Sequence, residues 1–377
     1  MAVLTEEQTM LRDGAQDWVT DRAPVSAFRK LRDSGAGTMD PALWKEIAEM
    51  GWAGIVVPEE HGGSDFGLTG MGLVLEEMGK QLVASPLFIS GLVAATAFRQ
   101  MGSAAQQGEW LPRIADGSAI VTLAVDEGNR HDTARTALTA EASGSGYVLN
   151  GTKTMVIDGM DADAMLVLAR TSGAPGHSAG LTLLIVPTDA AGIERHGLAT
   201  VDRRGHAKVT FSGVQVGPDA VLGEVGGAHA PLEKVLDVAR VGLAAEMLGM
   251  CQQAFDTTLA YLKTRVQFNT ILAQFQALQH RMADLFMEMQ LVRSAVEHAV
   301  REIDAGGDGA EEAAILAKAM ASDFANKMTR QMIQLHGGIG MTDQYDAGFY
   351  IKRSRLLEMT FGNAAQHCER WARMRGY

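Results

Sequence analysis

Cysteine, basic clusters and aromatic residues are scarce in this chain, and the first two shortages exclude whole classes of protein. The 377 residues include two cysteines, Cys251 and Cys368, so no disulfide framework is expected. No Cys/His cluster has the spacing of zinc ligands, so we expect no metal site. The formal net charge is -12 and no long block of Lys and Arg occurs, which argues against a nucleic-acid partner.

Long apolar runs are also lacking. None reaches the roughly 18 residues that a membrane span needs, and the longest, such as Ile89–Phe98, has the length of a buried helix. The first residues, Met1 to Gln8, are acidic and have no apolar signal core. We therefore expect a soluble, cytoplasmic protein, and the hydrophobic content of 47% is enough for a large core.

Three zones of different composition follow one another along the chain. Residues 1–117 have helical patterns, residues 118–224 have short β-branched runs between turn residues, and residues 225–377 have long runs with apolar 3–4 spacing. This order predicts an N-terminal helical domain, a middle antiparallel β-barrel or sandwich domain and a C-terminal four-helix bundle. The expected helices include Leu43–Gly51, Thr69–Leu82, Leu232–Leu262, Phe275–Ile303 and Glu311–Leu335; the expected strands are Ile120–Val125, Tyr147–Leu149, Met165–Ala169, Leu181–Val186 and Lys208–Phe211.

Ordered motifs near both ends of the chain resemble those of the acyl-CoA dehydrogenase superfamily. The family's signature is a Tyr, then Arg-x-x-Phe-Gly, then Gln and Ala-Asp, and a Gln-x-x-Gly-Gly-x-Gly loop follows later. The corresponding residues here are Tyr261, Arg265 to Asn269, Gln274 to Gln276, Met282 to Asp284 and Gln334 to Gly340, and Pro58 to Gly63 resembles the family's Pro-Glu-x-x-Gly-Gly turn.

The resemblance implies an FAD cofactor that neighbouring subunits share. A pyrophosphate needs a fixed guanidinium and closely approaching backbone N–H groups, which Arg265 and the pair Gly337-Gly338 would supply. In the family, these residues reach the flavin of the adjacent subunit, so an obligate oligomer is implied. The cofactor-binding residues expected on this basis are Arg265, Gln267, Phe268, Gln276, Gln334, Gly337 and Gly338.

A second implied function is CoA binding. Asp237 and Arg240 resemble the Asp-x-x-Arg pair with which family members hold the CoA part of the substrate. Their spacing puts the two side chains on one face of a helix, where a surface ion pair is the simpler alternative. The substrate that the resemblance implies is an acyl-CoA thioester, and the implied electron acceptor is electron-transferring flavoprotein.

The catalytic base is missing from both positions that the family uses. The α-proton of a thioester is weakly acidic, so a positioned carboxylate is the natural base. Alignment on Gly362 puts Phe361 at the first position, and the second, directly before Arg240, is Ala239. We therefore leave the catalytic residue unknown; the other candidates are Glu246, Glu76, Glu77, Asp126, His131 and Asp132.

The residues that serve a chain's own flavin ring also depart from the family pattern. The family's Thr-Glu-Pro-x-x-Gly-Ser-Asp becomes Val125 to Asp132, and its Trp-Ile-Thr becomes Met155 to Ile157. Val125 and Ile157 have no hydroxyl to offer the ring, which predicts weaker flavin binding within the chain. Asn269 replaces the signature glycine, a mild departure because Asn tolerates left-handed geometry.

These observations leave several functions open. The first is FAD-dependent α,β-dehydrogenation of an acyl-CoA by a homodimer or homotetramer, in fatty acid or steroid catabolism. The second is a catalytically silent subunit that completes the FAD site of another chain in a heterotetramer. A flavin oxidase or monooxygenase on the same fold is a third, although Asp237 and Arg240 argue against it, and a non-enzymatic helical scaffold is the last.

Overall fold

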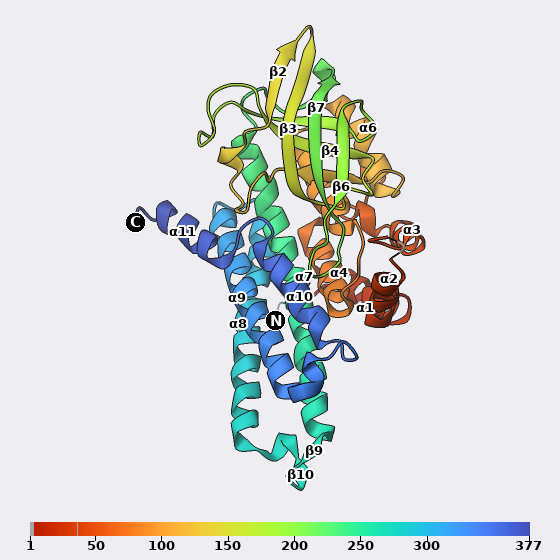
Figure 1. Ribbon diagram of the computed structural model, residues 1–377, viewed down its shortest axis with the longest axis vertical. Helices are drawn as coiled ribbons and strands as arrows, with labels where there is room; N and C mark the ends of the chain where they lie inside the picture. Colours follow the sequence, from red (N-terminus) through yellow and green to blue (C-terminus); the bar gives the residue numbers. More distant parts are fainter. Residues whose placement is uncertain (1–3, 36) are drawn as a thin grey trace. The chain divides into compact units, whose positions relative to one another are not determined.

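The computed structural model describes residues 4–35 and 37–377, and the chain divides into two compact units (Figure 1). The first unit comprises Met1–Lys30, Leu68–Val83 and Arg240–Tyr377, and the second comprises Leu31–Gly67 and Ala84–Ala239. The division falls inside one continuous helix, α7 (His229–Thr264). These units follow spatial contacts and not sequence order, so the predicted domain boundaries at 117/118 and 224/225 stay predictions.

Helices form most of the first unit. They are α1 (Glu6–Asp21), the start of α2 (Val25–Ser34), α4 (Gly67–Gln81), the second part of α7, α8 (Gln276–Asp304), α9 (Ala310–His336), α10 (Ala347–Met359) and α11 (Ala364–Met374). Helix α9 packs against α8, α10 and α11 (Figure 1). The sequence predicted α4, α7, α8 and α9 to within a few residues, because their apolar spacing is regular.

Glycines allow α4 and α7 to approach each other closely. A Cβ on Gly79 would lie 2.1 Å from the carbonyl oxygen of Glu246, and one on Gly249 would lie 1.7 Å from that of Glu76. Each helix therefore presents a glycine to the backbone of the other, at a distance that no side chain permits. This reciprocal contact fixes the rotation of α7 relative to α4.

The second unit combines short helices with a sheet. Besides the end of α2 and the first part of α7, its helices include α3 (Pro41–Glu49), the π-helical segment η3 (Leu87–Ala94), α5 (Ala95–Met101) and α6 (Ala104–Ala115). Every residue of η3 is buried, in agreement with the sequence-based interpretation of this apolar run. Among the described residues, no helix has the length and apolar character needed to cross a membrane.

The sheet has eight strands in the order β6-β7-β3-β2-β4-β5-β8, and β1 pairs with β4. The strands are β1 (Val121–Ala124), β2 (Thr139–Ser143), β3 (Gly146–Ile157), β4 (Ala164–Arg170), β5 (Leu181–Pro187), β6 (Ile193–Gly197), β7 (His206–Val216) and β8 (Val221–Leu222). Most pairs are antiparallel, as predicted, but β1 runs parallel to β4, and β2 also meets β4 in parallel at Thr139 and Arg170. Strands β2 and β6 escaped prediction because they are short and largely polar or exposed.

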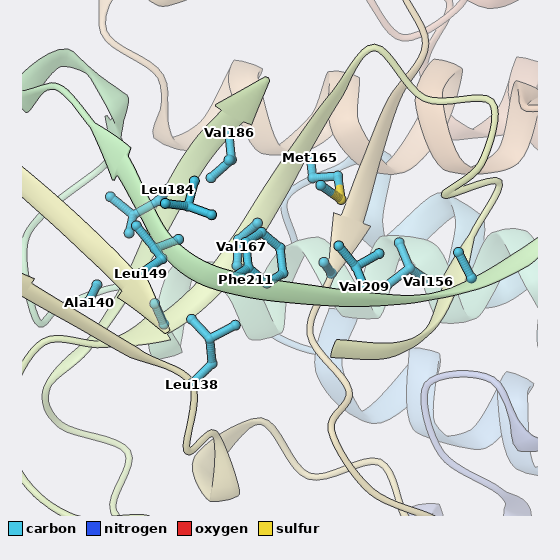
Figure 2. Packing of buried hydrophobic residues seen from close by; sticks show 14 residues of the cluster. Leu138, Ala140, Leu149, Val156, Met165, Val167, Leu184, Val186, Val209 and Phe211 are labelled. Carbon is cyan, nitrogen blue, oxygen red and sulfur yellow. The ribbon is translucent and has the colours of Figure 1, made fainter. Parts of the chain in front are cut away.

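The core of this unit lies on the sheet. Figure 2 shows buried side chains from several strands, among them Val167, Leu184, Val209 and Phe211, packed together. In β4 and β7, alternate residues belong to this cluster, as expected for strands whose successive side chains point to opposite faces, and β4 is buried on both faces. The rigid sheet therefore supports the loops between its strands.

We expect Gly249→Ala to destabilise the protein by about 3 kcal/mol, because the added methyl group overlaps the Glu76 carbonyl oxygen of α4. Urea denaturation of the purified protein measures this change. The control is Gly108→Ala in α6, where a Cβ meets no atom within 4 Å, and we expect it to stabilise by about 0.5–1 kcal/mol. Equal stability of both variants would contradict the close helix crossing.

Candidate functional site

The Arg-x-x-Phe motif forms a β-hairpin between α7 and α8 (Figure 1). Strands β9 (Val266–Gln267) and β10 (Thr270–Ile271) pair antiparallel and leave a two-residue turn. In that turn, Phe268 has φ +55° and Asn269 has φ +61°, the pattern of a type I′ turn. The expectation that Asn269 accepts left-handed geometry is confirmed.

Phe268 stands at the tip of this hairpin in an unfavourable state. Its side chain is 84% exposed, and a left-handed conformation costs a residue other than glycine about 1–2 kcal/mol. Its ring meets Phe275 edge-on with centroids 6.1 Å apart. A tip that keeps an aromatic ring in solvent at a backbone cost is suited to contact something outside the chain.

The other predicted cofactor residues of this segment are also exposed. Arg265 directly follows α7, Gln267 lies in β9, and Gln276 begins α8. The Gln267 amide donates to the Val266 carbonyl at 2.9 Å, whereas within residues 4–35 and 37–377 no side-chain hydrogen bond engages Arg265 or Gln276. The guanidinium of Arg265 is therefore available to an anion.

The predicted glycine loop is equally accessible. Gln334 lies in the last turn of α9, and Gly337 ends that helix with φ +64° and ψ −140°, a conformation that requires glycine. A Cβ on Gly337 or Gly338 would meet no atom of the chain within 4 Å. Gly338 has neither a positive φ nor a neighbouring atom that would exclude a side chain, so the fold of the chain itself does not require glycine there. A glycine at this position leaves the backbone open to the close approach of an external group.

An aromatic cluster connects α7, the helix before the hairpin, to the glycine loop. The ring of His336 lies 4.3 Å from that of Tyr261 and 4.6 Å from that of Tyr345. The Tyr261 hydroxyl donates to the His336 carbonyl at 3.3 Å. Nδ1 of His336 lies 2.7 Å from the Met332 carbonyl, and Nε2 lies 2.8 Å from the Tyr345 hydroxyl.

The loop at the first expected base position is held through its backbone. Phe361 is buried, with φ +54°, and its carbonyl accepts from Nε of Arg240 at 3.1 Å. The next carbonyl, that of Gly362, accepts from Lys318 and from His367, each at 3.1 Å. Lys318 also donates to two carbonyls in the last turn of α10, where helical partners are lacking.

Burial governs the protonation of this cluster. Desolvation, together with the positive charge of Arg240, lowers the pKa of Lys318 to about 7. Burial, and then the positive charges of Lys318, Arg240 and Arg370, lowers the pKa of His367 to about 2. His367 is therefore neutral at physiological pH, and its Nε2–H donates to the Gly362 carbonyl.

The predicted CoA pair is buried. Asp237 is 7% exposed and Arg240 is 3% exposed, so neither forms the simple surface ion pair that was the alternative. Arg240 Nε is engaged with the Phe361 carbonyl. CoA binding by these two residues stays a prediction, and the loop contact is a role for Arg240 that the sequence did not indicate.

Neither expected base position has a carboxylate, and most other candidates are paired. Ala239 is fully buried, and Phe361 is nearly fully buried. Among the candidates, Glu246 pairs with Arg353 at 3.1 Å and Glu76 pairs with Arg293 at 2.8 Å. These ion pairs are buried or half-buried, which holds both carboxylates in structural contacts.

Glu77 differs from those candidates. One carboxylate oxygen accepts from Lys80 at 2.7 Å, and the other, Oε2, is buried and has no hydrogen-bond partner in the part of the chain that the structure describes. Burial raises the pKa of Glu77, although the hydrogen bond and charge of Lys80 oppose the effect. A carboxyl group with a raised pKa and an unbonded oxygen has the chemistry of a proton acceptor or donor.

Residues elsewhere in the same unit hold the loop aligned with the family's own-ring motif. Glu127 accepts from the backbone N–H groups of Ala137 and Leu138 at 2.7 and 3.0 Å, and from Lys153 at 2.7 Å. The buried Lys153 also donates to the Val125 carbonyl at 3.1 Å. These groups satisfy one another and offer little to an additional ligand.

Other residues of this motif also pair with side chains of the same unit, and those of the second motif, Met155 to Ile157, are apolar. Asp126 and His131 lie 2.7 Å apart, between Oδ1 and Nδ1. Met155, aligned with the family's tryptophan, has φ +53° where the β3–β7 register is irregular. Ile157, aligned with the family's threonine, is buried. Asp132 takes part in an ion contact with Arg135 at 3.4 Å.

Sequence reasoning missed three residues that make hydrogen bonds in or beside the two loops, Lys318, His336 and Tyr345. For Lys318 a signal existed: a lysine among the apolar positions of the pattern Glu311–Leu335. His336 lies inside the recognised glycine motif, but only the structure shows its ring contacts. Tyr345 had no signal, because its contact partner was unknown.

Comparisons with known proteins identify the class. The models for acyl-CoA dehydrogenases match residues 5–118 with the N-terminal domain, 123–214 with the middle domain and 226–374 with the C-terminal domain. FadE12 of Mycobacterium tuberculosis, an acyl-CoA dehydrogenase by name, is 31% identical over 94% of this chain and 92% of its own length. The chain belongs to the acyl-CoA dehydrogenase family.

Two solved assemblies share the fold. A variant of the Tcur3481-Tcur3483 steroid ACAD is 33% identical, with a TM-score of 0.87 over 98% of this chain and 97% of that chain. The ChsE4-ChsE5 complex from Mycobacterium tuberculosis is 25% identical, with a TM-score of 0.90 over all of both chains. The predicted order of helical, β and helical domains is confirmed.

Family membership also confirms two biochemical predictions. Acyl-CoA dehydrogenases are FAD-dependent flavoproteins, and they are oxidoreductases that act on CH–CH bonds of acyl-CoA substrates. The observed residues fit the cofactor, because Arg265 and the open backbone at Gly337 and Gly338 suit a pyrophosphate. The individual roles of these residues stay predictions.

We expect His367→Gln to flatten the pH dependence of stability. Because the pKa of His367 is about 2 when folded and near 6.5 when unfolded, acidification protonates only the unfolded chain and so favours unfolding. Between pH 7.5 and 5.5 the unsubstituted protein should lose about 1.4 kcal/mol more than the variant.

Urea denaturation at several pH values measures this difference. Gln keeps an N–H that can reach the Gly362 carbonyl, so the loop contact survives in the variant. The control is His196→Gln, which makes the same substitution at an exposed histidine of strand β6. Parallel curves for the unsubstituted protein and His367→Gln would rule out a buried, neutral His367.

Proposed function

We propose that this chain is a subunit of a heteromeric FAD-dependent acyl-CoA dehydrogenase, in which it completes the flavin site of a second chain. That second chain, of the same family, supplies the catalytic base. The observation that carries the proposal is an asymmetry. The residues expected to serve a neighbour's flavin are exposed, whereas those expected to serve the chain's own flavin are replaced, buried or bonded to one another.

The exposed set would hold the dinucleotide of the neighbour. Arg265 would pair with the pyrophosphate, Gly337 and Gly338 would let the backbone approach it, and Phe268 would pack against the cofactor. Gln267, Gln276 and Gln334 would add amide hydrogen bonds. A flavin held there would supply an acceptor for the hydride from the β-carbon of the acyl thioester.

Exposed apolar side chains support an oligomer. On α8, Phe286, Met287 and Leu291 are 50%, 59% and 62% exposed, and Met341, after the glycine loop, is 76% exposed. Such side chains on one helical unit are typical of a surface that another subunit covers. Both solved assemblies described above have names that join two different chains, which favours a heteromer over a homo-oligomer.

The lack of a carboxylate at both base positions of the family completes the argument. Phe361 and Ala239 cannot accept a proton, and Glu246 and Glu76 are engaged by arginines. Proton abstraction from the substrate then belongs to the partner chain. We assign electron-transferring flavoprotein as the electron acceptor of the assembly on the resemblance to the family alone.

A self-sufficient dehydrogenase is the second candidate, and Glu77 favours it. This carboxyl group is buried, has a raised pKa and has one oxygen without a hydrogen bond. In the family, the helix that follows the Gly-Gly turn lines the acyl pocket. Glu77 would then be the base, and Glu77→Gln would abolish flavin reduction without loss of flavin.

The proposal is tested by an anaerobic absorbance titration with a panel of acyl-CoAs. Alone, the chain should be colourless or carry flavin that no acyl-CoA bleaches. Co-expressed with an acyl-CoA dehydrogenase chain from a neighbouring gene, it should yield an oligomer with one reducible FAD per pair of chains. Bleaching by the chain alone would overturn the proposal in favour of the self-sufficient enzyme.

Arg265→Ala in this chain should weaken FAD binding by the assembly about 10- to 100-fold, the effect of losing a charged hydrogen bond. Fluorescence of released flavin during dilution measures the dissociation constant. The control is Arg301→Ala, which removes an exposed arginine in the last turn of α8 and should leave flavin affinity unchanged. Equal flavin affinity in both variants would contradict the role of Arg265.

A further inference from the structure

The residues expected to bind the neighbour's flavin come from two segments far apart in the sequence. Arg265 follows α7, whereas Gly337 and Gly338 follow α9. A pyrophosphate contacted by both needs their separation fixed to within about 0.5 Å. No hydrogen bond or ion pair recorded among the described residues joins Arg265 directly to Gly337 or Gly338. The separation must therefore be set by other side chains.

The aromatic cluster of Tyr261, His336 and Tyr345 is placed to do this. Tyr261 lies one helical turn before Arg265, and the Arg265 N–H donates to the Tyr261 carbonyl at 2.8 Å. His336 is the residue before Gly337. The ring contact of 4.3 Å and the hydrogen bond of 3.3 Å between Tyr261 and His336 thus connect the two segments.

Tyr345 fixes the orientation of the His336 ring. A carbonyl only accepts, so Nδ1 of His336 carries the proton that it donates to the Met332 carbonyl. Burial lowers the pKa of His336, which keeps the imidazole neutral, and Nε2 then accepts from the Tyr345 hydroxyl at 2.8 Å. Both ring nitrogens are engaged, so the ring cannot rotate without loss of a hydrogen bond.

We propose that Tyr345, through His336 and Tyr261, is a positioning residue that sets the distance between Arg265 and Gly337-Gly338 and thereby the affinity for the neighbour's dinucleotide. The inference rests on the proposed function, because it concerns the residues that hold the proposed flavin site in place. It also accounts for Gly340, where a Cβ would lie 3.0 Å from the His336 Cβ and 2.8 Å from the Ile333 carbonyl oxygen. The loop folds back tightly enough to bring Tyr345 to the His336 ring.

The test uses the flavin-loaded oligomer, purified with the partner chain, and measures the FAD dissociation constant of four variants. Tyr345→Phe removes only the hydroxyl that bonds His336, and we expect about fivefold weaker FAD binding. Tyr350→Phe is the matched control: its buried hydroxyl donates to the Lys80 carbonyl at 2.8 Å and not to His336 or to a proposed cofactor residue, so its loss should leave FAD affinity unchanged. The other two variants are Arg265→Ala and the double variant Arg265→Ala/Tyr345→Phe.

The double variant separates a positioning role from a general loss of stability. If Tyr345 acts by placing Arg265 and the glycine loop, its substitution should weaken FAD binding less than twofold once Arg265 is absent. The inference would be overturned if the effects of Arg265→Ala and Tyr345→Phe on the free energy of FAD binding were fully additive. It would also be overturned if Tyr345→Phe and Tyr350→Phe weakened FAD binding equally. An unchanged dissociation constant in Tyr345→Phe beside a raised one in Arg265→Ala would overturn the inference alone. An unchanged dissociation constant in Arg265→Ala would overturn the proposed function.

Discussion

The close approach of α4 and α7 determines much of the first unit. With Gly79 against Glu246 and Gly249 against Glu76, the backbones are in contact and α7 has one rotation available. That rotation directs Arg240 to the Phe361 carbonyl and Tyr261 to the ring of His336. The two loops that matter for function, one after α9 and one after α10, are therefore aligned by the same helix.

Those two loops differ in what they offer to a ligand or substrate. The loop at Phe361 and Gly362 is held by Arg240, Lys318 and His367, yet it presents no acidic side chain. The loop at Gly337 is equally well supported and remains open to an external group. In this chain hydrogen bonds hold both loops in place, but only the loop at Gly337 keeps residues suited to bind a ligand. This is consistent with a division of functions between two kinds of subunit.

The sequence predicted the architecture well, because long helices with regular apolar spacing and β-branched runs are strong signals. It predicted less well where the physical cause is non-local. The parallel pairing of β1 with β4 depends on a partner distant in the chain, and the short strands β2 and β6 lack an apolar pattern. The motif residues around Arg265 and Gly337 were found from the sequence because each needs a particular residue type.

The supporting residues were largely beyond reach. Lys318 and Arg240 reveal their roles only when the carbonyls they contact are known, and Tyr345 only when the ring of His336 is in place. The sequence suggested that Asp237 and Arg240 contact CoA or form a surface pair, and it gave no sign of their burial. Burial follows from the packing of the whole fold and not from the helix that bears the residues.

The contacts on the Phe361 loop have an evolutionary consequence. Arg240, Lys318 and His367 bind carbonyl oxygens, which every residue type possesses, so these contacts do not depend on which side chain occupies position 361. A lineage can therefore exchange the side chain there and keep the loop folded. Gene duplication followed by such an exchange gives two chains that remain compatible in one assembly while only one retains the reaction.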